Sequence, residues 1–157
     1  MAFDQEAVNT LFDRVQSHAM TLGIFSSVNG HEPKSAPATT GLTAAFWADT
    51  IRPVPAASGL AATSVAIVFK GRLYTNMLAE PADMIDPNLL AAADLLLGGY
   101  SGDFDLGGTI RNVDLLGSTA GTGLSGQAGY LSQDGRLYRI FDLSIPCIVT
   151  DLWTQVA

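Results

Sequence analysis

Residues 136–153, RLYRIFDLSIPCIVTDLW, decide the fold class. Apolar side chains recur at every second position, which is the period of a strand with one buried face. Pro146 cannot donate to a strand ladder, so we expect an edge or a bulge there. Asp134–Gly135, just before this stretch, predicts a type I′ hairpin turn. The face that we expect to be buried consists of Leu137, Phe141, Leu143, Ile145, Cys147 and Val149, together with Arg139.

Further strands are predicted on the N-terminal side of this segment. LSGQAGYLSQ (124–133) is the partner that the hairpin turn requires, and TIRNVDLLG (109–117) precedes it. SVAIVFKGRLYTN (64–76) and LTAAFWADTIRPV (42–54) are rich in β-branched and aromatic residues, as strands are. IFSSV (24–28) predicts a short strand.

Two helices are expected from capping and periodicity. Asp4 is a natural N-cap and Gly23 a natural C-terminal residue for the first helix. We expect His18, in its last turn, to be solvated. In the second helix, Asp86 suits the N-cap, Pro87 the first turn, and 98–99 (Gly-Gly) the end. Because this helix is apolar on nearly all sides, we expect it to be covered on more than one side. The apolar stripe of the first helix is Val8, Leu11, Phe12, Val15, Ala19 and Leu22.

The order of these elements predicts an α+β fold in one domain, residues 1–157. Two main helices pack against an antiparallel or mixed sheet, and the connecting loops are long and rich in Pro, Ala and Gly. We expect Leu11, Phe12 and Val15 to lie on a sheet surface that includes Ile67, Phe69, Phe141 and Leu143.

The composition restricts the class of function. The chain has 48% hydrophobic but only 15% charged residues. We therefore expect other subunits to cover part of its surface. Eight Lys and Arg and a net charge of −7 argue against tight DNA binding. Cys147, the single cysteine, is expected to be a buried structural thiol. We find neither a signal peptide at the start of this sequence nor an apolar run of the ~20 residues that a membrane helix needs.

The sequence offers little catalytic chemistry. His31 and Glu32 form an HEP triplet in a Pro-rich loop, VNGHEPKSAP (28–37), without the spacing of a zinc site. GSTAGTGLSG (117–126) lacks the lysine of a phosphate-binding loop, and we interpret it as a flexible hairpin tip. Asp103 and Asp105 are paired carboxylates only by proximity in sequence. We therefore predict no catalytic residue, no cofactor and no metal site.

The chain as a whole resembles the tail terminator proteins of long-tailed bacteriophages, especially those of actinobacterial hosts. The resemblance lies in VNGHEPKSAP, GLTAAFWADTIRPV, SGLAATSVAIVFKGRLYTNML, DMIDPNLLAAADLLLGGYSGDFDLGG and GYLSQDGRLYRIFDLSIPCIVTDLW, in this order. It implies a virion protein of the tail and neck, assembled in the host cytoplasm. It further implies a homohexameric ring that caps the tail tube, ends its polymerisation and presents a surface to the head–tail connector.

Two small-residue segments are candidates for contacts with neighbouring subunits or with the tail tube protein. They lack Lys and Glu side chains, whose immobilisation costs conformational entropy. The DNA would pass through the ring without specific binding. The alternatives are another neck subunit, such as a head completion or connector protein, or a small enzyme that uses His31, Glu32 or the glycine-rich turn. The candidate interface residues are Pro55, Ala56, Ser58, Gly59, Leu60, Ala61, Gly117, Ser118, Gly121, Gly123 and Ser125.

Overall fold

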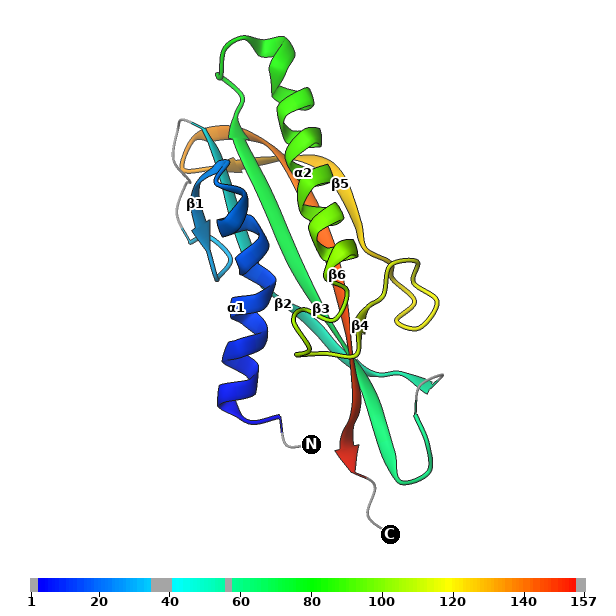
Figure 1. The fold of residues 1–157 in the computed structure, drawn as a ribbon. Coiled ribbons are helices and arrows are strands. Elements are labelled where there is room, and N and C mark those ends of the chain that lie inside the picture. Colours follow the sequence, from blue (N-terminus) through cyan, green and yellow to red (C-terminus); the bar gives the residue numbers. More distant parts are fainter. Residues whose placement is uncertain (1–2, 35–40, 56–57, 155–157) are drawn as a thin grey trace.

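The computed structural model describes residues 3–34, 41–55 and 58–154 (Figure 1). The predicted α+β fold, with two helices and a mixed sheet, is confirmed. The candidate interface residue Ala56 lies outside the described residues. The elements are α1 (Gln5–Leu22), β1 (Phe25–Asn29), β2 (Leu42–Pro53), β3 (Ala62–Asn76), η2 (Ala82–Met84), α2 (Ile85–Gly102), β4 (Asn112–Val113), β5 (Ser125–Gln133) and β6 (Arg136–Thr154).

The two longest strands form the centre of the sheet. β3 and β6 pair antiparallel from Ala62 opposite Thr154 to Asn76 opposite Tyr138. β2 continues the sheet antiparallel to β3, and β1 adds a short parallel edge to β2. The other side of β6 pairs first with β5 and then with β4. The sheet order is therefore β1-β2-β3-β6-β4, with β5 beside the first half of β6.

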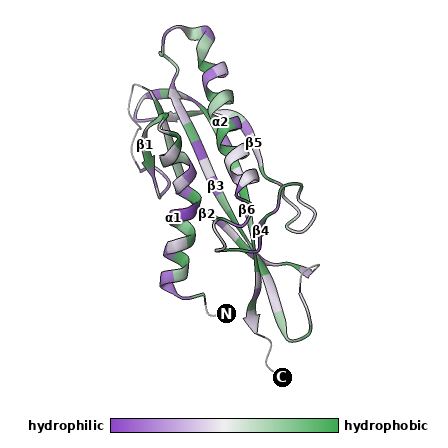
Figure 2. Cartoon of the chain, viewed as in Figure 1, coloured by the Kyte–Doolittle hydropathy of each residue, from purple (hydrophilic) through white to green (hydrophobic). Residues whose placement is uncertain are grey.

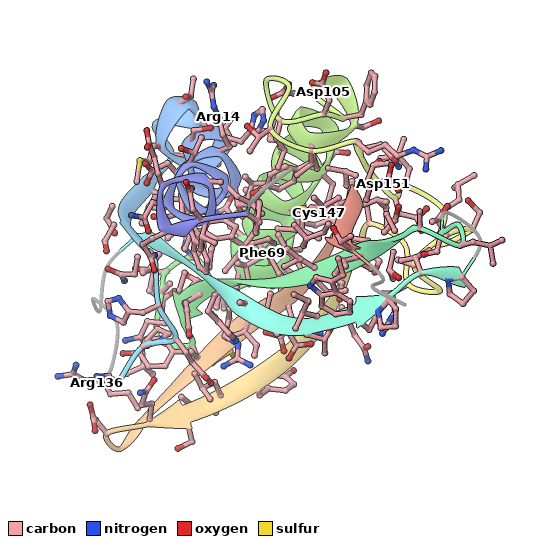
Figure 3. All side chains as sticks on the ribbon, turned by 90° about the horizontal axis from the view of Figure 1, so that it is seen from below. Arg14, Phe69, Asp105, Arg136, Cys147 and Asp151 are labelled. Carbon is pink, nitrogen blue, oxygen red and sulfur yellow. The ribbon has the colours of Figure 1, made fainter. Side chains whose placement is uncertain are left out.

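Both helices cover the same face of the sheet, as the view along it shows (Figure 3). α1 begins at the predicted cap, where the Asp4 carboxylate accepts a hydrogen bond from the Ala7 N–H at 2.9 Å. It ends at Gly23, whose φ of 67° is left-handed. The Phe12 and Phe69 rings meet edge to face, 5.1 Å apart. The predicted core is confirmed: Leu11, Val15, Ile67, Phe69 and Leu143 belong to one buried cluster, with Phe12 and Phe141 packed against it.

The limits predicted for α2 are wrong at both ends. A turn of 3₁₀ helix leads into α2 at Ile85, so Asp86 lies inside the first turn and pairs with Arg139 at 2.9 Å instead of capping. The helix continues through Gly98 and Gly99 to Gly102. A Cβ atom at Gly99 would lie 3.1 Å from His18 Nδ1, so this glycine permits a close approach of α1.

Only one side of α2 is covered by the described part of this subunit. Figure 2 shows that the helix is hydrophobic over most of its length. Leu89 and Leu96 are buried, whereas Leu90 and Leu95 remain 60% and 49% exposed. Coverage on more than one side is therefore not found within the described residues, and the outer apolar side chains of α2 face solvent.

β6 buries different faces along its length, which corrects the prediction of one odd-numbered face. From Leu143 to Val149 the odd residues do face the helices. Nearer the hairpin, Leu137 is 48% exposed, while Tyr138 and Ile140 are buried on the opposite face with Tyr74. The reason is that Trp47 and Leu131 pack over this second face.

Pro146 lies in the middle of the sheet, so the predicted edge or bulge is wrong. It pairs opposite Val68 of β3, and its carbonyl accepts from the Asp114 N–H at 2.9 Å. The N–H and C=O of one strand residue point to the same side, so the missing donor faces away from β3. On that side β5 pairing ends at Ser144 and β4 pairing begins at Cys147. Pro146 thus lies at the junction between β5 and β4, where its missing N–H costs the sheet no ladder hydrogen bond.

The hairpin turn between β5 and β6 is as predicted. Asp134 and Gly135 have φ values of 52° and 73°. A type I′ turn requires two such positive angles. This turn sets the register from Gln133 opposite Arg136 to Ser125 opposite Ser144.

Candidate interaction surfaces

The HEP triplet is an exposed segment of a loop. His31 and Glu32 are both exposed. The Pro33 carbonyl accepts a hydrogen bond from Gln133 Nε2 at 3.2 Å, which joins the loop to the end of β5. The described part of the chain contains no group of three His, Cys, Asp or Glu side chains placed to hold a metal ion. Within the described residues, this loop therefore contacts the β5–β6 hairpin through Pro33.

The other histidine joins the two helices, which corrects the expectation of a solvated helix end. His18 Nε2 lies 3.0 Å from Asp103 Oδ2, and the His18 ring meets Tyr100 edge to face at 5.1 Å. The Tyr100 hydroxyl donates to the Val15 carbonyl. Asp103 also accepts from the Gly107 N–H at 3.0 Å. Burial raises the pKa of the Tyr100 hydroxyl, so it remains a neutral donor. These contacts hold the C-terminal halves of α1 and α2 together.

Residues 114–124 form a loop held by hydrogen bonds, although the sequence predicts a flexible hairpin tip at 117–126. The carboxylate of Asp114, only 3% exposed, accepts from the N–H groups of Gly117, Thr119 and Ala120 at 3.1, 2.9 and 2.6 Å. Gly117 is needed for its φ of 78° and because a Cβ there would lie 2.9 Å from the Gly123 nitrogen. The predicted strand 109–117 is reduced to Asn112–Val113, since the chain turns at Asp114.

The first candidate segment, in the β2–β3 connection, presents an isolated leucine. Ser58 Oγ donates to the Val54 carbonyl at 2.6 Å and accepts from the Ser64 N–H at 3.0 Å. Gly59 N–H donates to the Ala62 carbonyl at 3.0 Å. Between these braces Leu60 is 97% exposed. We name residues 58–61 the hairpin tip, and we use this name only for the β2–β3 connection, not for the 114–124 loop. Pro55, Gly59 and Ala61 are also exposed.

The two candidate segments adjoin at their bases. The Arg52 guanidinium donates to the Ala120 carbonyl. Ala120, Val54, Ala66 and Ile148 form a small buried cluster on the sheet face away from the helices. Leu116, which is not among the candidates predicted from the sequence, is 91% exposed on this loop. Among the candidates in this segment, Ser118 and Gly121 are exposed, Gly117 and Gly123 are half-buried, and Ser125 is exposed at the start of β5.

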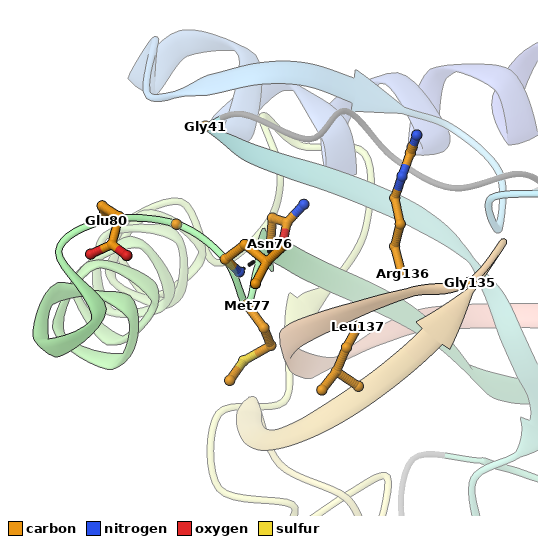
Figure 4. Close-up of a pocket in the computed structure, with 9 residues that line it drawn as sticks. Gly41, Asn76, Met77, Glu80, Gly135, Arg136 and Leu137 are labelled. Atoms are coloured by element: carbon orange, nitrogen blue, oxygen red, sulfur yellow. Dashed lines mark hydrogen bonds between the residues drawn. The ribbon is translucent and has the colours of Figure 1, made fainter.

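A cavity of about 870 Å³ lies at the other end of β3 (Figure 4). Its lining is mostly apolar and includes Met77, Leu78 and Leu137, with Glu80 and Arg136 as the charged members. Figure 4 shows Met77 and Leu137 on one side of the cavity and Arg136 pointing away from them. Leu78 is 86% exposed. This site could not be predicted from the sequence, because its walls come mainly from two turns that lie far apart in the chain, Asn76–Glu80 and Gly135–Leu137.

The outer edge of β5 is open in the described structure. β5 pairs only with β6, and its nine residues include neither a charged side chain nor a proline. Exposed edges are commonly protected by such residues. Arg139 steadies the middle of the strand, because its guanidinium lies 4.4 Å from the Tyr130 ring centroid and donates to the Gly129 carbonyl at 3.3 Å.

Large exposed apolar side chains recur outside these sites. Besides Leu60, Leu78 and Leu116, the exposed set includes Met20, Ile51, Leu90, Leu95, Phe104, Tyr130 and Trp153.

Neither described helix has the length and apolar content needed to cross a membrane. No protein-family model matches the chain, and no curated protein matches it significantly.

Proposed function

We propose that this chain is a structural subunit of a phage neck, which forms a ring on the tail tube, ends its polymerisation and offers a surface to the head–tail connector. The observation that carries the proposal is the exposure of Leu60 and Leu78, at 97% and 86%. Burying one leucine side chain gains roughly 1.5–3 kcal/mol. Such side chains therefore favour association, and the resemblance of the sequence to tail terminator proteins supplies the kind of assembly.

The proposed ring is homomeric, and the resemblance implies six subunits. Its partners are the tail tube protein on one side and the connector protein on the other. Its place is the virion neck, and it takes no cofactor and catalyses no reaction.

The charges of the subunit agree with a channel through which DNA passes without being held. The net charge is −7. Arg72 pairs with Asp142 at 2.5 Å, Arg139 pairs with Asp86, and Arg52 is bound to a backbone carbonyl. Guanidinium groups occupied within the subunit are poor ligands for phosphates, and DNA affinity depends on such ligands.

The test is the mass of the purified protein, alone and mixed with purified tail tubes. Mass photometry and negative-stain electron microscopy should show rings in solution, or rings that appear only at tube ends. Either result supports the proposal. A strict monomer that binds no tube end at high concentration would contradict it.

A charge placed on the hairpin tip should weaken this assembly. Ala61 is exposed there, so Ala61→Glu should leave the unfolding curve unchanged while ring formation needs a higher protein concentration. Gln5→Glu, which adds the same charge at the exposed start of α1, away from the apolar side of α2, is the control. Equal assembly of Ala61→Glu and wild type would show that the tip makes no contact in the ring.

A further inference from the structure

A single long strand, β3, connects an apolar projection at one end of the subunit to an apolar cavity at the other. Leu60 lies two residues before the start of β3, and Asn76, the last residue of β3, lines the cavity. β3 has 15 residues. At the usual rise of a strand, such a length separates the two features by about 46 Å. Figure 1 places them at opposite ends of the molecule. They cannot meet within one chain.

The projection is prepared for docking. Its backbone is braced on both sides of Leu60, by the Ser58 hydroxyl and by the Gly59–Ala62 hydrogen bond. None of its side chains is charged, and all except Leu60 are small. Little rotamer freedom is therefore lost when a partner covers the projection. The absence of charge also means that no ion has to be desolvated.

The cavity is equally well defined. The Met77 N–H donates to the Leu137 carbonyl at 3.1 Å, which ties its two walls together. The Leu78 N–H donates to Asn76 Oδ1 at 2.8 Å, which holds the turn. Drug-sized ligands occupy pockets of roughly 300–1000 Å³. The cavity, at about 870 Å³, therefore has room for a leucine and its small neighbours.

We propose that the hairpin tip of one copy docks into this cavity of a second copy, with Leu60 against Met77, Leu78 and Leu137. The inference rests on the proposed function, because it names the contact by which subunits of the ring associate. Two different patches meet in this contact, so it is heterologous. Such contacts close into a ring when the rotation between copies fits, and otherwise extend into a filament.

Cross-linking between variants that each carry one added cysteine tests the contact directly. Leu60→Cys and a mass-tagged Leu78→Cys are mixed under oxidising conditions at a concentration where wild type assembles, alone or on tail tubes. A disulfide requires Cα atoms about 4.4–6.8 Å apart, so a covalent heterodimer forms only if tip and cavity meet between chains. Cys147 is fully buried and does not compete. We expect the heterodimer to exceed both homodimers.

Substitution supplies an independent measurement with a matched control. Leu60→Asp and Leu78→Asp should each weaken association at least about tenfold, and the double variant should be little weaker than either single one, because both remove the same contact. Leu116→Asp, at a leucine almost equally exposed, should change association less than about threefold. Circular dichroism checks that each variant is folded.

The outcomes separate this inference from the proposed function. If wild type assembles but the heterodimer is no more abundant than the homodimers, or Leu116→Asp is the more damaging change, the tip–cavity contact is wrong and the ring stands. If wild type stays monomeric both alone and with tubes, both are wrong.

Discussion

The carboxylate of Asp114 should be a large single contributor to the stability of the 114–124 loop. Asp114→Ala removes the acceptor of three backbone N–H groups, those of Gly117, Thr119 and Ala120. It also releases Ala120 from the buried cluster that includes Ile148. The change therefore affects both the local fold of the loop and its attachment to the sheet.

The magnitude follows from the three hydrogen bonds. A bond to a charged acceptor contributes about 1.5–3 kcal/mol, so three of them would give at most about 4.5–9 kcal/mol. Desolvation of the carboxylate opposes this contribution. Gly117 and Thr119 are only half-buried, so water can replace part of what they lose. We expect a net loss of about 2–4 kcal/mol from a total stability of about 5–15 kcal/mol. Asp114→Asn keeps one acceptor oxygen and should lose about half as much.

Guanidinium unfolding, followed by tryptophan fluorescence and circular dichroism, measures the loss. Fluorescence reports on Trp47 in β2 and Trp153 in β6, whereas circular dichroism reports on the secondary structure of the whole chain. Coincident transitions by these two probes would establish two-state behaviour. Asp94 is an exposed carboxylate on α2 and serves as the control. Asp94→Ala should change stability by less than about 0.5 kcal/mol, as surface substitutions usually do. A loss below about 0.5 kcal/mol for Asp114→Ala, the range of such surface changes, would refute the argument that this carboxylate holds the loop.

Three further predictions concern the core, the HEP loop and the cysteine. Leu11 is 1% exposed and lies in the core. Leu11→Ala should therefore cost about 2–5 kcal/mol in the same unfolding experiment, and a cost under about 0.5 kcal/mol would mean that the stripe is not packed. Changing His31 and Glu32 together to Ala should leave the unfolding midpoint and the metal content by mass spectrometry unaltered; loss of a stoichiometric metal would overturn this. Burial raises the pKa of the Cys147 thiol to about 12. The reactive thiolate is therefore scarce at mildly alkaline pH in the folded protein and abundant once the chain unfolds. A thiol reagent should accordingly label Cys147 slowly in buffer and rapidly in guanidinium, and fast labelling in buffer would contradict the burial.

Signals that act over a few residues were readable without the structure. Asp4 and Gly23 bound α1 as predicted, and Asp134–Gly135 forms the predicted hairpin turn. Caps and tight turns depend on hydrogen bonds and φ angles of near neighbours, so the local residues suffice. The apolar periods of 3.6 and 2 likewise placed the helix stripe and the core half of β6. The α+β class follows from the order of these elements.

Where contacts between distant residues compete with local signals, the tertiary structure decided. Asp86 suits an N-cap, yet Arg139 of β6 binds it, and the helix starts two residues earlier than that cap would place it, at Ile85. Gly99 suits a helix end, yet the close approach of His18 gives the glycine a packing role inside the helix.

The surfaces that bear on function depend on the tertiary structure even more strongly. The hairpin tip was a candidate from its composition alone, because small uncharged residues are visible in sequence. The cavity could not be a candidate from the sequence, because Asn76–Glu80 and Gly135–Leu137 become its main walls only when β3 pairs with β6. Pro146 illustrates the same dependence: a residue that should break a strand is tolerated in the central one, because its missing N–H faces the junction between β5 and β4. A sequence specifies which groups a residue can offer, but the pairing of distant strands determines which of those groups meet a partner and which remain exposed.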